Sequence, residues 1–139
     1  MTMRHPPYLP SPDANVGQHV WLAGVLGNAQ DAAVAVLRCR TGSEQDEFFA
    51  SRALCQAGIQ ALATLQQSVA ALPAEIRREL GGVDWESWQN LDEFMPPITA
   101  HRRDQVWEAM GGLASSLLMG LQRLRRRTPS LFNPMGYLG

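Results

Sequence analysis

The chain has 139 residues and a formal net charge of −1, and 45% of its residues are apolar whereas 18% are charged. These values predict one compact domain with a hydrophobic core, and they argue against a protein whose main ligand is nucleic-acid phosphate. The chain shows no run of about 18 apolar residues, and its N-terminal stretch lacks the apolar segment of a signal peptide. We therefore expect a cytoplasmic protein with no membrane contact.

The first part of the chain combines a proline-rich stretch with a helical pattern. Residues 1–12 contain four prolines and are expected to form a flexible, extended arm. Asp13 can then cap a helix that reaches about Arg40. Its buried stripe is expected at Val16, Val20, Ala23, Leu26, Val34 and Leu37.

Three glycines in this first helix allow another backbone to approach closely. Two interpretations stay open. The glycines pack tightly within the chain, or they belong to a dimer interface. The interface predicted in the second case consists of Gly17, Val20, Gly24 and Gly27.

The next helices follow from capping and breaking residues. Ser43 and Asp46 resemble a capping box for a second helix, whose apolar positions are Leu54, Ile59, Leu62, Leu65, Val69 and Leu72. Pro73 is expected at the first position of a short third helix, which Gly81 and Gly82 end. Asp84 can cap a fourth helix, which the two prolines at 96–97 stop.

The last helix is expected to begin at Thr99. Its apolar positions recur four and three residues apart, at Val106, Met110, Leu113, Leu117, Gly120 and Leu124. No alternating strand pattern appears, so the sequence predicts an all-α fold, an up-and-down bundle of four main helices plus one short helix over residues 13–128. The tail, residues 129–139, either docks on the bundle or reaches a partner.

Cys39 and Cys55 each lie within a helical pattern and have no further ligand at metal-binding spacing. Two buried, reduced thiols are therefore expected rather than a disulfide or a metal site. The sequence indicates no metal and no cofactor.

A basic run lies near the end of the last helix, at Arg123, Arg125, Arg126 and Arg127. These arginines can complement the negative end of the helix dipole and keep the surface soluble. The alternative is a patch that faces RNA.

The order of landmarks from Ser43 onward resembles the HepT-like proteins of the HEPN superfamily. The similar elements are a helix start with phenylalanines, a long helix, "LPAEIRREL", "VDWESWQNL" and "DQVWEAM". This resemblance implies a helical dimer and an RNase signature in which His follows Arg after four to six residues. His101 is the only histidine between Trp85 and Trp107, and it has no arginine at that spacing. Catalytic residues are therefore not predicted.

An alternative use for this region is the recognition of a protein. Trp88, Leu91, Phe94 and Met95 are large apolar residues of a kind that anchors interfaces, and acidic residues flank them. Trp88 can equally belong to the core. The sequence thus predicts a non-catalytic regulatory protein, antitoxin-like or anti-activator, that binds and masks a protein partner as a homodimer; a divergent HEPN-type ribonuclease toxin is the alternative.

Overall fold

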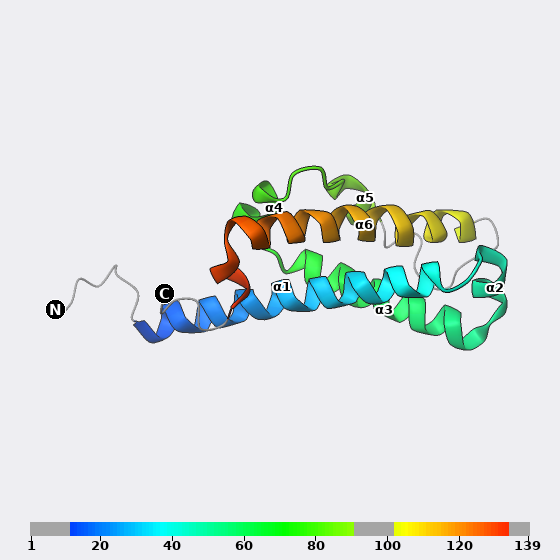
Figure 1. Ribbon diagram of the computed structural model, residues 1–139, viewed down its shortest axis with the longest axis horizontal. Coiled ribbons are helices and arrows are strands. Elements are labelled where there is room, and N and C mark those ends of the chain that lie inside the picture. The colour runs from blue at the N-terminus through cyan, green and yellow to red at the C-terminus, as the bar shows by residue number, and fades with distance from the viewer. Residues whose placement is uncertain (1–11, 91–101, 134–139) are drawn as a thin grey trace.

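A computed structural model of the chain describes residues 12–90 and 102–133 (Figure 1). Helices hold 87% of these residues and strands hold none, which confirms the predicted all-α fold. Three long helices pack together, namely α1 (Pro12–Thr41), α3 (Arg52–Ala70) and α6 (Arg103–Arg127). The shorter helices are α2 (Gln45–Ala50), α4 (Ala74–Glu79), α5 (Trp85–Asn90) and the 3-10 helix η3 (Pro129–Phe132).

The α1 helix is the shared partner of the other two long helices, because it packs along both α3 and α6 (Figure 1). Its inner side is built mainly of small residues, which let the neighbouring helices approach closely. These buried positions are Ala23, Leu26, Ala29, Ala32, Ala33 and Val36. Val34 and Leu37, expected in the core, are only half-buried.

The beginning of α1 differs from the prediction in two ways. The helix already includes Pro12, so the predicted arm can cover residues 1–11 only, and these lie outside the described part of the chain. Val20, expected in the core, is 43% exposed. The physical reason is that Val20 lies on the outward face of α1 with the exposed Gly24, on the side of the helix away from the buried stripe around Leu26.

The predicted second helix is interrupted at Ser51 and forms two helices. The Ser51 hydroxyl accepts a hydrogen bond from the backbone N–H of Leu54 at 3.2 Å and caps α3. Leu54 therefore lies in the first turn of α3 and is 42% exposed, not buried as expected. The start of α2 is also shifted by one residue, because Glu44 and Glu47 form its capping box in place of Ser43 and Asp46.

The break at Ser51 lets α2 turn its phenylalanines toward α6. Phe48 is fully buried, and its ring lies edge-on to Phe49 at 5.0 Å and tilted against Trp107 at 5.5 Å. Gly58 makes room for this cluster, since a Cβ at Gly58 would lie only 2.5 Å from the Phe48 ring. This close approach is a constraint that the amino-acid sequence does not reveal.

The α6 helix supplies much of the hydrophobic core on the side that faces α1. Five of its six predicted apolar positions are buried, and Leu113 is half-buried. Arg40 at the end of α1 also holds this helix, because its Nε donates to the Trp107 carbonyl at 3.0 Å and its guanidinium lies 4.8 Å from the Trp107 ring. The predicted start at Thr99 lies outside the described residues.

The described part of the tail docks on the bundle rather than reaching away from it. Leu131 and Phe132 pack against the core, and the Arg125 guanidinium lies 5.6 Å from the Phe132 ring. The His19 ring is hydrogen-bonded to the carbonyl of Asn133 at 2.7 Å. Residues 129–133 therefore join the ends of α6 and α1.

The segment Gly17–Thr41 is long and apolar enough to cross a membrane by length and composition, contrary to the sequence-based expectation. The core helix of a soluble protein passes the same test, and the inner side of α1 forms part of the bundle core. The cytoplasmic location stays a prediction.

Candidate functional site

Of the four residues predicted to bind a partner, the structure describes Trp88, which is not exposed. This side chain is 4% exposed and belongs to the hydrophobic core, so the core alternative holds for it. Its indole Nε1 has no hydrogen-bond partner among the described residues. Leu91, Phe94 and Met95 lie outside the part of the chain that the structure describes.

Trp85 and Arg77 show how this region is fixed to α3. Trp85 is half-buried, and the Arg77 guanidinium lies 5.5 Å from its ring. The same guanidinium donates to the carbonyls of Val69 and Ala70 at 3.0 and 3.3 Å. Arg77 thereby adds a donor at the end of α3, where the Val69 carbonyl already accepts from the Leu72 backbone N–H at 3.1 Å.

Among the described residues, a groove of about 630 Å³ lies between α5 and α6. On the α5 side it is lined by Asp84, Ser87 and Asn90. On the α6 side it is lined by Asp104, Gln105, Glu108, Ala109, Gly112, Leu113 and Ser116. We call this hollow the acidic groove, because these lining residues include three carboxylates and no basic group.

The floor of the acidic groove is low because α6 carries small residues there. A Cβ at Gly112 would meet no atom within 4 Å, and Ala109 and Ser116 are also small. Positions 105, 108, 112 and 116 follow helical spacing, so they occupy one face of α6. The groove is therefore an outward-facing trough in α6 with α5 as a side wall.

Asp84 shapes the rim of the acidic groove and the start of α5 together. The Ser87 hydroxyl donates to Asp84 Oδ2 at 2.7 Å, and the Ser87 backbone N–H donates to Oδ1 at 3.1 Å. Both bonds lower the pKa of the Asp84 carboxyl below its usual value, and the bond from the Ser87 hydroxyl has the larger effect. The predicted N-cap role of Asp84 is confirmed, and the carboxylate is held in its charged form.

A second hollow, of about 490 Å³, lies further along α6 and carries the opposite charge. We call it the basic hollow, and its lining residues are Arg78, Glu79, Gly81, Arg123, Arg126 and Arg127. Arg123 donates to the Gly81 carbonyl and Arg127 to the Glu79 carbonyl, both at 3.0 Å. Arg127 also pairs with the Glu79 carboxylate at 3.6 Å.

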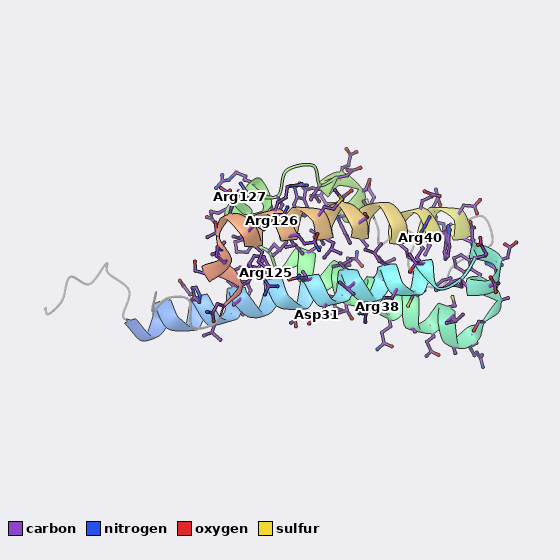
Figure 2. The ribbon with its side chains drawn as sticks, in the orientation of Figure 1. Asp31, Arg38, Arg40, Arg125, Arg126 and Arg127 are labelled. Carbon is purple, nitrogen blue, oxygen red and sulfur yellow. The ribbon has the colours of Figure 1, made fainter. Side chains whose placement is uncertain are left out.

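Arg125 behaves differently from the other arginines of the predicted basic run. It donates to the Gln30 side chain at 3.2 Å and lies over Phe132, so it faces α1 and the tail. Figure 2 shows Arg125 between α6 and α1, whereas Arg127 lies on the side of α6 away from α1. The structure thus divides a run that looks uniform in the sequence.

The predicted dimer residues lie on an open face of α1. Within residues 12–90 and 102–133, a Cβ at Gly17, Gly24 or Gly27 would meet no atom within 4 Å, so these glycines do not serve close packing in this part of the chain. Val20 is exposed, and its neighbour Trp21 is 52% exposed. This geometry overturns the intramolecular interpretation and leaves the dimer interpretation as a prediction.

The thiols and histidines do not form a reactive cluster among the described residues. Cys39 and Cys55 are free and half-buried, rather than fully buried as expected. Burial raises the pKa of the Cys55 thiol, and the charge of Arg103 partly opposes this effect. Across residues 12–90 and 102–133 no three His, Cys, Asp or Glu side chains are placed to hold a metal ion. His101 lies outside these ranges.

Comparison of the chain with protein-family models, with curated proteins and with solved structures found no match. The resemblance to HepT-like proteins therefore stays a prediction.

Proposed function

We propose that the chain is a non-catalytic helical regulatory module that binds and masks a protein partner. The observation that carries this proposal is the acidic groove, in which carboxylates border a floor of small and apolar residues. A partner that fits this chemistry is an amphipathic helix with a narrow apolar ridge and basic residues along both edges. An antitoxin-like or anti-activator role is consistent with such masking.

The charges and the floor of the acidic groove have different tasks. An exposed ion pair contributes only about 0.2–1 kcal/mol, so the carboxylates of Asp84, Asp104 and Glu108 mainly set specificity and association rate. Burial of apolar surface contributes roughly 25 cal/mol per Å², so the floor around Leu113 supplies more of the affinity. Binding by this groove should therefore depend on salt without being abolished by it.

A designed peptide tests the groove directly. The probe is a helical peptide of about 18 residues with an alanine-leucine ridge and arginine edges, and its counterpart carries glutamate edges. We expect the basic peptide to bind the wild-type chain. Glu108→Arg should raise the Kd of this peptide by about tenfold or more. Glu75→Arg is the matched control, because Glu75 is an exposed acid of α4 outside the groove. Equal binding of both peptides, or no effect of Glu108→Arg, would contradict the proposal.

The ribonuclease alternative has one observation in its favour, the four arginines of the basic hollow. A cation near phosphate is one requirement of RNA cleavage, and a positioned group for proton transfer is another. We expect purified protein not to degrade RNA and its expression not to be toxic. RNA cleavage that disappears in His101→Ala with the fold preserved would establish the enzyme instead.

A further inference from the structure

The outward face of α6 carries an ordered pattern of charge and size. Its exposed or partly exposed positions follow helical spacing at Gln105, Glu108, Gly112, Ser116, Met119, Arg123 and Arg126. The first third of this face is acidic and belongs to the acidic groove, while the last third is basic and belongs to the basic hollow. Such a face is complementary to itself when read in the opposite direction.

We propose that the occupant of the acidic groove is a second copy of this chain, with the two α6 helices packed antiparallel about a two-fold axis. This inference rests on the proposed function, because it names the partner of the same groove. The axis passes between Ser115 and Ser116, which are near the middle of the outward face. The arrangement is closed, since each copy presents the same patch to the other.

Charge complementarity supports this register at both ends. Glu108 and Arg123 lie equally far from the axis on opposite sides, so Glu108 of each copy is level with Arg123 of the other. Gln105, which is uncharged, is level with Arg126, where its amide oxygen can accept a hydrogen bond from the guanidinium. The long arginine side chains of the basic third can therefore reach the carboxylates of the acidic third, twice per dimer.

The fit of side-chain sizes supports the same register. Met119 is 54% exposed, and it is level with Gly112 of the second copy. Gly112 has nothing within 4 Å of a Cβ position, so it offers a hole for the flexible methionine. One register thus satisfies both the charge pattern and the packing of the largest exposed apolar side chain on this face.

The flanking helices are arranged in agreement with this pairing. The α5 end near Asp84 borders the acidic groove, and Arg78 of α4 borders the basic hollow. The segment between α4 and α5 packs on α6, since Leu80 and Val83 lie 3.5 and 3.6 Å from a Cβ position at Gly120. The two-fold axis runs perpendicular to α6 and parallel to the interface, so it leaves α4 and α5 of both copies on the same side of the paired α6 helices. Because the α6 helices are antiparallel, α5 of each copy then lies next to α4 of the other.

A charge swap tests the interface. Sedimentation equilibrium of the wild-type chain at about 100 µM should show a dimer. Salt near roughly 500 mM should weaken this dimer, because it shortens the screening length of charges to about 4 Å. Glu108→Arg and Arg123→Glu should each weaken the dimer by about tenfold or more. The double variant should restore it, because each inverted pair is again opposite in sign. Unchanged thermal unfolding of the variants controls for folding.

A cross-link tests the register. Oxidation of an equal mixture of Gly112→Cys and Met119→Cys chains should give a disulfide between the two introduced cysteines, identified by mass spectrometry. Gly112→Gln should abolish the dimer without loss of stability, since the side chain fills the hole on an exposed helical position. Gly24→Gln on α1 should leave the dimer intact.

Three outcomes overturn the inference, and they are distinguishable from failure of the proposed function. A dimer lost in Gly24→Gln and kept in Glu108→Arg assigns the interface to the glycine face of α1. A wild-type monomer at about 100 µM that still binds the basic peptide through Glu108 retains the proposed groove and removes the second copy. A monomer that binds neither peptide overturns both.

Discussion

Two regions of this molecule use glycine and tryptophan in opposite ways. At the junction of α2, α3 and α6, Gly58 lies against the Phe48 ring, and Trp88 is part of the same core. On the outward faces of α1 and α6, Gly24 and Gly112 have open space around them, and Trp21 is half exposed. The difference teaches that residue type alone does not separate a packing constraint from a binding surface, whereas the neighbouring atoms do.

The largest effect expected from this comparison belongs to Trp88→Ala. Because Trp88 is 4% exposed in the core, its truncation should lower the free energy of unfolding by about 3–5 kcal/mol. Trp21→Ala is the matched control, and as an exposed position in a monomer it should cost less than about 0.5 kcal/mol. Urea unfolding followed by circular dichroism measures both. A loss at Trp88 below that at Trp21 would show that the core assignment is wrong.

Gly58→Ala sharpens the comparison at the level of a single methyl group. The added Cβ would lie 2.5 Å from the Phe48 ring and 3.1 Å from Met110 Cε, and the ring is fully buried with no free side to move into. Overpacking of this kind costs about 1–3 kcal/mol, and the better helix propensity of alanine returns up to about 1 kcal/mol. We expect a net loss of stability, seen as a lower melting temperature.

Gly24→Ala is the counterpart of Gly58→Ala on the open face. No atom lies within 4 Å of its Cβ position, so only the helix-propensity gain of up to about 1 kcal/mol applies. The two alanine variants should therefore shift the melting temperature in opposite directions. Shifts of the same sign would break the distinction between the packed and the open glycines.

The amino-acid sequence predicts the parts of this fold that depend on local chemistry. Helical spacing identifies the buried side of α6, and Asp84 is recognisable as a cap. The break at Ser51 is not predictable in this way, because the apolar pattern continues through it from Phe48 onward. Val20 is exposed because the apolar spacing that includes it lies on the outward side of α1, and spacing alone does not show which side of the helix packs against its neighbours.

The candidate site was even less accessible from the sequence. The acidic groove joins Asp84 with Glu108, and only the packing of α5 beside α6 brings them to one hollow. The partner-binding prediction selected large side chains such as Trp88, which burial removes from the surface. A usable signal was nevertheless present, because the exposed face of α6 changes from acidic to basic along a single helix.

The smallest expected effect concerns Asp84, which lies between the packed and the open regions at the rim of the groove. Its hydrogen bonds from Ser87 lower its pKa in the folded state, so the unfolded state binds the proton more tightly. The stabilisation is therefore complete above the unfolded pKa of about 3.9 and is lost as the pH falls through the folded value. Asp84→Ala should unfold at a lower temperature than the wild type at pH near 7, and the two should converge toward about pH 2. Ser87→Ala removes the hydroxyl donor and keeps the backbone donor, so its melting temperature should fall between those of the wild type and Asp84→Ala. A difference in melting temperature between wild type and Asp84→Ala that grows toward acid pH would contradict the assignment of Asp84 as a charged cap of α5 at the rim of the groove.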